Sequence, residues 1–306
     1  MESEFKPVLD ALSDALECDD GQARRVFHGR GGCYPGLEWL TLDDFGEGLW
    51  LVLFREPPPA LEQVLVAGVT ALAGERRQFA LMQRRYRRPA EVEVLWGQVP
   101  DVVCAQEGEL RFKLQLEGRQ NTGYFMDASP GRVWLAGRCA GKRVLNLFAY
   151  TCAFSVAARQ AGATTVVNVD MAKAALRTGR DNHRINGHSM DGVEFLGYDI
   201  FRSWKRIRSL GPYDCLIVDP PSFQKGSFDA RKDYVRLLRK VPELISDQAE
   251  LLFCLNAPYL DENFLQEMIA DALPDVEIVG FLPPRADFPE QMPALKMLHC
   301  RFTGQR

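Results

Sequence analysis

Short apolar runs alternate with segments of helix length from about residue 119 to the end of the chain. Seven of these runs have the length of a strand, and we expect strands at 144–148, 165–169, 193–196, 215–218, 250–255, 276–281 and 295–302. Helices are expected between them at 153–161, 172–185, 229–245 and 261–273. This alternation predicts a parallel sheet covered by helices on both faces.

The first third of the chain has a different pattern. Turn residues fill positions 28–36, a strand-like run follows at 49–54, and three prolines at 57–59 end it. A helix is expected at 60–73, followed by strands at 92–96 and 110–116. We therefore predict an N-terminal α+β domain over residues 1–118 and an α/β domain over residues 119–306.

The loops after the predicted parallel strands should hold the functional site, because ligands of such sheets bind at the carboxyl ends of the strands. The first loop, 149–155, lies in a stretch without glycine between Gly141 and Gly162. The Gly-x-Gly-x-x-Gly motif that binds a dinucleotide pyrophosphate is therefore missing. NAD and FAD are not expected, whereas a nucleoside without a diphosphate remains possible. Alternatively, Asn146 and Thr151 only cap the helix that follows.

Acidic residues follow the second and third strands. Asp170 ends the second run, at a position where a carboxylate can accept hydrogen bonds from ribose hydroxyls. It is equally suited to capping the next helix. Asp199 follows the third run close to Phe201, and a carboxylate beside an aromatic ring can receive an adenine base.

The fourth loop has the most specific pattern, Asp-Pro-Pro-Ser-Phe at 219–223. Its two prolines force an extended backbone that cannot pair as a sheet. The Asp219 carboxyl, the Pro220 carbonyl and the Phe223 ring together suit a planar, polar heterocycle. A simple turn is the alternative interpretation.

Composition limits the class of protein. The chain has 306 residues, of which 46% are hydrophobic, and a formal net charge of −4. These values exclude disordered and low-complexity classes, and the acidic balance gives no overall electrostatic argument for a polyanionic partner. The eight cysteines form no Cys-x-x-Cys pair, so we expect buried reduced thiols and no metal site. Neither a membrane span nor a secretory signal is expected, which favours a cytoplasmic protein.

Local charge differs from the average. Six arginines and no acidic residue occur between positions 76 and 88: Arg76, Arg77, Arg84, Arg85, Arg87 and Arg88. A second basic set follows the fourth loop: Lys225, Arg231, Lys232, Arg236, Arg239 and Lys240. A single run of this kind is often a solvated helix face. Two runs, one in each predicted domain, favour contact with the phosphates of a nucleic acid.

These motifs, in this order, resemble one known family. They are His-Gly-Arg-Gly-Gly-Cys-Tyr-Pro-Gly at 28–36, Gln-Asn-Thr-Gly-Tyr-Phe-Met-Asp at 120–127, Asn-Leu-Phe-Ala-Tyr-Thr-Cys-Ala-Phe-Ser at 146–155, Asp170 and the 219–223 loop. The chain is similar to the class I S-adenosylmethionine-dependent methyltransferases of the bacterial large-subunit (23S) ribosomal RNA methyltransferase I and K/L family. The resemblance covers most of the chain. It implies a Rossmann-like seven-stranded α/β sheet with an antiparallel last strand, S-adenosyl-L-methionine as cofactor and RNA as partner.

The resemblance also implies a set of site residues. The cofactor pocket would comprise Thr122, Tyr124, Phe125, Asp127, Arg132, Asn146, Phe148, Tyr150, Thr151, Asp170, Asp199, Ile200 and Asp219. In this set Asn146, Phe148, Tyr150 and Thr151 correspond to the methionine and ribose side, Asp170 to the ribose ligand, and Asp199 and Ile200 to the neighbours of adenine. The catalytic residues beside the target base would be Asp219, Pro220, Phe223 and Asn256.

Three departures from the family pattern limit what is carried over. The arginine that relatives carry soon after the Tyr-Phe-x-Asp aspartate is absent, which leaves Arg132, and Ala153 replaces a common glycine. Cytosine-C5 members have a cysteine where this chain has Leu255, and Cys254, one place off, would point to the other face of a strand. Attack on cytosine C5 needs a thiolate, so that reaction is disfavoured. Asn256 matches the guanine-N7 branch better, but the nucleotide and the methylated atom stay open.

We therefore expect a methyltransferase that acts on a base of large-subunit ribosomal RNA or its precursor. Two alternatives remain from the sequence. The first is a methyltransferase acting on a protein or small molecule, because a proline-rich loop can also orient a side-chain amide. The second is a noncatalytic RNA-binding module that serves ribosome assembly. The sequence does not determine the oligomeric state.

Overall fold

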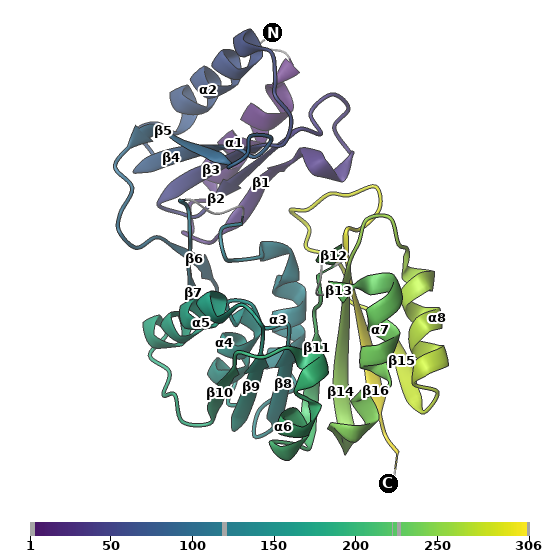
Figure 1. The fold of residues 1–306 in the computed structure, drawn as a ribbon. Helices are drawn as coiled ribbons and strands as arrows, with labels where there is room; N and C mark the ends of the chain where they lie inside the picture. Colours follow the sequence, from purple (N-terminus) through teal and green to yellow (C-terminus); the bar gives the residue numbers. More distant parts are fainter. Residues whose placement is uncertain (1–3, 118–120, 222, 225–227, 305–306) are drawn as a thin grey trace. The chain divides into compact units, whose positions relative to one another are not determined.

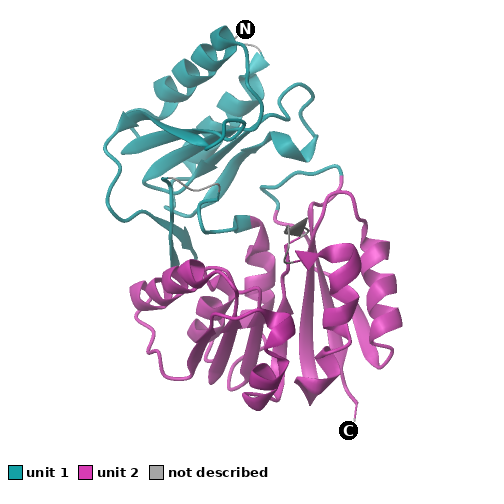
Figure 2. Cartoon of the chain, viewed as in Figure 1, with its two compact units in different colours: residues 1–126, 286–291 teal, residues 127–285, 292–306 magenta. Residues whose placement is uncertain are grey.

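The computed structural model describes residues 4–117, 121–221, 223–224 and 228–304, with only the backbone of 223–224. The chain divides into two compact units (Figure 2): the first contains Met1–Met126 and Ala286–Gln291, and the second contains Asp127–Arg285 and Met292–Arg306. The domain boundary predicted between 118 and 119 lies outside the described residues.

The first unit is built on a five-stranded sheet in the order β1-β2-β3-β4-β5. The strands are β1 (Arg24–His28), β2 (Leu40–Asp44), β3 (Gly48–Leu53), β4 (Phe79–Arg84) and β5 (Glu91–Gly97). The helices α1 (Lys6–Glu17) and α2 (Pro59–Ala73) pack with the sheet around one apolar core (Figure 1). Helix α2 connects β3 to β4, the parallel pair among otherwise antiparallel neighbours. A separate hairpin is formed by β6 (Cys104–Glu107) and β7 (Leu110–Lys113).

Periodicity predicted only part of this unit. The expected strand at 49–54, the helix at 60–73 and the strand at 92–96 correspond to β3, α2 and β5, whereas the strand expected at 110–116 ends at Lys113. The interpretation of 76–88 as a helix face is wrong, because β4 begins at Phe79 and its residues 79–83 are buried. The residues between the two groups of arginines therefore form a buried strand of the sheet.

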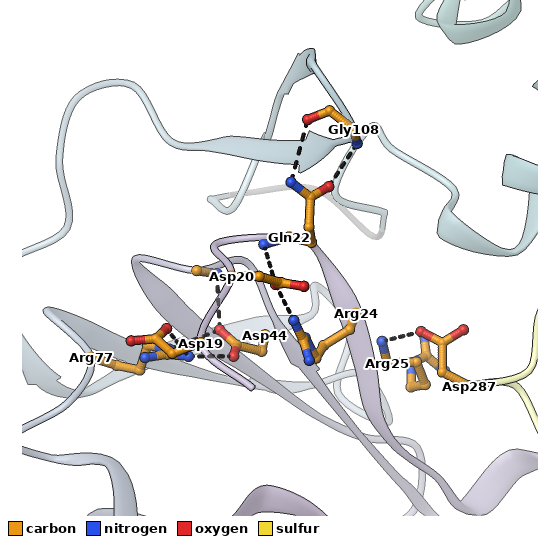
Figure 3. Close-up of polar contacts among 10 residues, drawn as sticks. Asp19, Asp20, Gln22, Arg24, Arg25, Asp44, Arg77, Gly108 and Asp287 are labelled. Carbon is orange, nitrogen blue, oxygen red and sulfur yellow. Dashed lines mark hydrogen bonds and ion pairs between the residues drawn. The ribbon is translucent and has the colours of Figure 1, made fainter. Parts of the chain in front are cut away.

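The segment Ala286–Gln291 belongs to the first unit although its neighbours in sequence belong to the second. The Asp287 carboxylate accepts a hydrogen bond from the backbone N–H of Arg25 at 2.9 Å (Figure 3). The segment also packs closely against the loop after β1. A Cβ atom at Gly31 would lie 1.8 Å from the carbonyl oxygen of Pro289. Only glycine fits such an approach of two backbones.

The second unit contains a seven-stranded sheet in the order β10-β9-β8-β11-β14-β16-β15. Its strands are β8 (Arg143–Leu147), β9 (Thr165–Val169), β10 (Val193–Leu196), β11 (Tyr213–Val218), β14 (Ile245–Asn256), β15 (Val276–Phe281) and β16 (Leu295–Phe302). The first five in spatial order are parallel, and β16 runs antiparallel to both of its neighbours. This confirms the expected Rossmann-like α/β sheet of seven strands.

Helices cover both faces of this sheet (Figure 1). They are α3 (Ser129–Ala136), α4 (Ala153–Gln160), α5 (Lys173–Ile185), α6 (Trp204–Ser209), α7 (Ala230–Leu238) and α8 (Glu262–Ala272). Side chains of α3 and α4 fill the core on one face, and side chains of α6, α7 and α8 fill the core on the other. The helix expected at 229–245 is shorter than predicted. Pro242 falls in a 3-10 turn, Val241–Glu243, since proline is not tolerated in a helix interior, and β14 begins at Ile245.

The described residues also bear on the expected cysteine chemistry and membrane contact. All eight cysteines are free, and those at positions 139, 152, 215, 254 and 300 are buried. In the described part of the chain, no helix has both the length and the apolar character that crossing a bilayer requires.

Candidate active site

The loop after β8 has an unusual backbone. Phe148, Tyr150 and Cys152 all have positive φ angles, of 59°, 46° and 62°. The left-handed region is unfavourable for residues with a side chain, and such strain persists only where the surroundings impose it. This loop stands at the carboxyl end of a central strand, where ligands of parallel sheets bind.

Asp170, at the end of the neighbouring strand β9, holds this loop in place. Its Oδ2 accepts a hydrogen bond from the backbone N–H of Tyr150 at 2.8 Å, and its Oδ1 accepts one from Ala172 at 2.7 Å. Each carboxylate oxygen has a second lone pair, so the same side chain can still accept hydrogen bonds from a ligand.

The capping interpretations of these loop residues are wrong. Helix α5 begins at Lys173, and its N-cap position is Ala172 rather than Asp170. Helix α4 has Cys152 at its N-cap position, without a side-chain cap, and the Asn146 side chain bonds Asn168 instead. These polar side chains are therefore used for other contacts.

Asn146 belongs to a buried polar network behind the loop. Its Nδ2 donates to Oδ1 of Asn168 at 3.0 Å, and Nδ2 of Asn168 donates to Oγ of Ser155 at 2.9 Å. The Ser155 hydroxyl lies 2.9 Å from Nε2 of His183. Burial, with the charges of nearby His188 and Arg159, lowers the pKa of His183 to about 3, so this imidazole is neutral at pH 7.

The sequence reasoning missed Asn168, Ser155 and His183. The signal that could have found them is a polar residue inside the apolar run Thr165–Val169, because a buried amide requires hydrogen-bond partners. The network joins β8, β9, α4 and α5, and it fixes the side chain of Asn146 beneath the strained loop.

The loop after β10 places Asp199 and Ile200. Asp199 is the N-cap residue of a short 3-10 helix, Ile200–Arg202, and its Oδ1 accepts a hydrogen bond from the N–H of Phe201 at 2.9 Å. Ile200 is buried. The Phe201 ring stacks at 6.3 Å from the ring of Phe228, and the Phe228 ring also contacts Phe148 at 5.2 Å and Tyr234 at 6.2 Å. Aromatic packing thus connects the first and third loops.

Asp219 ends β11 and has an altered acidity. Burial of its carboxyl group and, next, the negative charge of Asp127 raise the pKa of Asp219 to about 7, against the opposing effect of Arg132. Arg132 on α3 is only 2% exposed. In the described part of the chain no hydrogen bond reaches the Asp219 carboxyl. The carboxyl groups of Asp219 and Asp127 outnumber the single guanidinium of Arg132, so the local charge favours a cationic ligand group.

The cysteine of interest lies on β14. Cys254 packs in the core on one face of the sheet, and Leu255 packs in the core on the other, as the strand periodicity predicts. Burial, followed by the charges of Asp219 and Asp127, raises the pKa of the Cys254 thiol well above its ordinary value. The group is a thiol at neutral pH and not the thiolate that nucleophilic attack requires. Asn256 is exposed at the end of the same strand.

The remaining predicted residues have separate positions. Thr122, Tyr124 and Phe125 belong to the first unit. There the Tyr124 ring stacks on Phe112 with 4.9 Å between centroids, and Phe125 is exposed. In the 219–223 loop Pro220 is buried, whereas the side chain of Phe223 lies outside the described residues.

The residues of the second unit fit the chemistry of S-adenosylmethionine. Asp170 offers acceptor oxygens for ribose hydroxyls, and buried Ile200 beside Asp199 offers an apolar surface with an acceptor for adenine. The Asp127, Asp219 and Arg132 cluster suits a ligand end that carries both a positive amino group and a carboxylate. The fit rests on the set of polar groups at the carboxyl ends of adjacent strands.

Comparison with known proteins identifies relatives of this chain. Among curated relatives, ribosomal RNA large subunit methyltransferase I of Aeromonas hydrophila is 26% identical over 268 residues, which cover 83% of this chain and 68% of that protein. The Photobacterium profundum protein of the same name is 27% identical over 296 residues, covering 92% of this chain and 74% of the relative. The crystal structure of SMU.776, assigned as a methyltransferase and complexed with SAH, superposes with a TM-score of 0.86 at 25% identity, over 98% of this chain and 80% of that one.

The family model for S-adenosylmethionine-dependent methyltransferases matches residues 24–302, which span both units. The match includes all four loops at the carboxyl ends of β8, β9, β10 and β11. The chain belongs to the S-adenosylmethionine-dependent methyltransferases.

Proposed function

We propose that this methyltransferase modifies a base of large-subunit ribosomal RNA. The observation that carries the proposal is the Asp219 carboxyl at the end of β11, partly buried, without a hydrogen bond from the described residues, and followed by two prolines. Such a group is an available partner for the edge of a base. The curated relatives named above are ribosomal RNA methyltransferases, which favours RNA over other substrates.

In this proposal the protein mainly positions the reactants. When bound, S-adenosylmethionine supplies a methyl group on a positively charged sulfur. Asp170 accepts hydrogen bonds from the ribose, while Arg132 and Asp127 receive the carboxylate and the amino group of the methionine part. Asp219 and the Pro220 carbonyl orient the acceptor base. Holding an acceptor lone pair in line with the transferred group lowers the barrier without a strong acid or base.

The proposal favours a ring or exocyclic nitrogen as the methylated atom. Methylation at cytosine C5 needs a thiolate nucleophile, and the raised pKa of Cys254 disfavours that role. Asn256, exposed at the end of β14, can hydrogen-bond the target base beside Asp219. We assign Phe223, in the same loop as Asp219, to stacking on that base.

We further propose that the first unit recognises the substrate. A base inside folded RNA must leave its stack before it can react, so a second surface that holds the RNA backbone is needed. Both units have exposed basic residues. Arg88 is exposed in the first unit, and Arg231, Lys232 and Arg239 are exposed on or next to α7 in the second. Lys225 of the second basic set lies outside the described residues.

The test is methyl transfer from radiolabelled S-adenosylmethionine to naked ribosomal RNA, isolated large subunits or total protein, followed by mass-spectrometric mapping. We expect label in one ribosomal RNA nucleotide. The Asp219→Ala variant should lose methyl transfer by about 100-fold or more at saturating cofactor, because the acceptor base is misplaced. Its cofactor affinity, measured in parallel, should fall much less, since Asp170, Asp127 and Arg132 remain. Label confined to protein would overturn the proposed substrate, and absence of transfer to any of these acceptors would favour a noncatalytic role.

A further inference from the structure

Most arginines of the run between positions 76 and 88 are already engaged within the first unit. Arg77 forms two hydrogen bonds with the Asp44 carboxylate, at 3.0 and 2.8 Å, and also pairs with Asp19 (Figure 3). The Arg76 guanidinium donates to the carbonyl oxygen of Leu16 at 2.7 Å. Arg77 is buried and ion-paired, so it is not available to a ligand, whereas exposed Arg76 has a backbone carbonyl as its partner.

The arginines at and after the end of β4 are also ion-paired within the first unit. Arg84 pairs with Glu62 on α2 and with Glu91 and Glu93 on β5. Burial acts to lower the pKa of Arg84, but the hydrogen bonds and charges of Glu62 and Glu93 together raise it. Arg87 pairs with Glu91. Their charges are thus compensated by acidic residues outside the run.

Arg85 has a different environment. Throughout the described ranges no carboxylate pairs with it, and its hydrogen bond goes to the neutral amide oxygen of Asn121, at 2.9 Å. Burial and the charge of Arg30 lower the pKa of Arg85, which is the opposite direction from Arg84. Two like charges therefore stand close together without a compensating acid.

One aromatic ring holds both guanidinium groups. The Arg30 guanidinium carbon lies 4.4 Å from the centroid of the Phe54 ring, and that of Arg85 lies 5.3 Å from the same centroid. A guanidinium held against an aromatic face keeps its N–H edge free for other partners. Arg30 is exposed, and Arg85 is half-buried.

The backbone beneath these side chains is closely packed. Arg30 lies in the 3-10 turn Gly29–Gly31, where a Cβ at Gly29 would come within 1.9 Å of the Leu37 carbonyl oxygen. Arg85 continues β4, and its N–H donates to the carbonyl oxygen of Leu53 at 2.8 Å, next to Phe54. The two guanidinium groups are thus presented from fixed positions, one directly after the internal strand β4 and one in the 3-10 turn after β1.

We propose that Arg30 and Arg85, held against Phe54, form a clamp for the phosphate backbone of RNA on the first unit. The proposal rests on the proposed function, since it names the place where the RNA substrate is held. Planar guanidinium groups match the geometry of phosphate oxygens and bind them with two parallel hydrogen bonds. An anion between the two charges relieves their repulsion, which no carboxylate of the described chain does.

The experiment measures binding of fluorescein-labelled oligouridylate over a series of salt concentrations. The variants are Arg30→Gln, Arg85→Gln and the double variant, and Arg87→Gln is the matched control from the same run. Each phosphate contact on a single strand contributes about 0.7 to the slope of log affinity against log salt. We expect the double variant to lose about 1.4 in slope and about tenfold or more in affinity at low salt. The control should change affinity less than about twofold, because its charge is already compensated by Glu91.

Binding of S-adenosylmethionine, measured in every variant, reports whether the fold is retained. Arg30→Gln replaces an exposed side chain, so it tests the clamp even if Arg85→Gln were to destabilise the protein. Retained slope and affinity in Arg30→Gln and in the double variant, while the wild type binds the oligonucleotide and methylates ribosomal RNA, would overturn the clamp and leave the proposed function standing. An equal loss in Arg87→Gln would also overturn it. A wild type that neither binds nor methylates RNA would remove both proposals.

Discussion

Asp170 and Asp219 directly follow two strands of the same sheet, β9 and β11, which are separated only by β8, yet their carboxyl groups are in opposite situations. Asp170 accepts two backbone hydrogen bonds, whereas no described residue donates to Asp219 and its pKa is raised to about 7. The difference teaches that position at a strand end does not define a role. A carboxylate whose hydrogen bonds are made within the protein holds the loops of the site in place. A carboxylate without such bonds can accept them from a ligand or a base.

The largest effect is expected from Asp170→Ala. This change removes the acceptor that holds Tyr150 and Ala172. Each charge-assisted bond contributes about 1.5–3 kcal/mol, so the free energy of unfolding should fall by about 3 kcal/mol or more. Cofactor affinity should fall about 100-fold, as calorimetry of S-adenosylmethionine binding would measure. Asp170→Asn, which keeps one acceptor oxygen, should lose less in both measurements. Unchanged binding in Asp170→Ala would show that the two carboxylates are equivalent.

A smaller effect, with a pH signature, is expected from Asp219→Asn. The raised pKa means that the folded protein takes up a proton on Asp219 more readily than the unfolded chain. The stability from this proton is fully present below the ordinary pKa of 3.8 and is lost as the pH rises through about 7. The variant should therefore be more stable than the wild type at pH 8, by at most about 4 kcal/mol, and should lack this slope.

Denaturant unfolding of the cofactor-free protein between pH 4 and pH 8 measures the difference. The exposed Asp247→Asn variant is the control and should keep the wild-type slope. The same pH dependence in Asp219→Asn and in the wild type would show that burial does not destabilise the ionised Asp219 carboxylate. Asp219 would then not differ from Asp170 in this respect.

The smallest effect is expected from Cys254→Ala. The hydrogen bond from the Tyr234 hydroxyl goes to the backbone carbonyl of Cys254 at 2.9 Å, so it survives the change. Loss of a buried sulfur should cost about 1 kcal/mol of stability. Single-turnover methyl transfer to ribosomal RNA should stay within about twofold of the wild type. A loss of about 100-fold or more would instead assign Cys254 a part in the chemistry beside Asp219.

The sheet of the second unit could be predicted from the sequence because buried parallel strands are continuous apolar runs. The expected strands at 165–169 and 193–196 have the bounds of the parallel strands β9 and β10. Those at 276–281 and 295–302 have the bounds of β15 and β16, which are antiparallel, so their apolar residues predicted the strands but not their direction. The end of α7 was predicted less accurately. The apolar pattern continues to Ile245, but the helix ends at Leu238 and Pro242 lies in a separate 3-10 turn.

The charge environments could not be predicted. The run around Arg84 has no acidic residue in sequence, but its partners Glu62 and Glu93 come from α2 and β5. The polar network of Asn168 likewise depends on two helices, α4 before it in the chain and α5 after it. Residues far apart in sequence decide which arginine is compensated and which carboxyl group is satisfied, so these properties require the structure. The assignment of the site residues to cofactor and base stays a prediction.

The segment Ala286–Gln291 has a consequence for how such proteins can be recombined. Because it completes the first unit from within the β15–β16 connection, the two units are not consecutive modules of the gene. A fragment ending at Met126 would lack the Asp287 partner of Arg25 and the backbone that packs on Gly31. Exchange of either unit between relatives would have to carry this distant segment along, so the two units are expected to be inherited together.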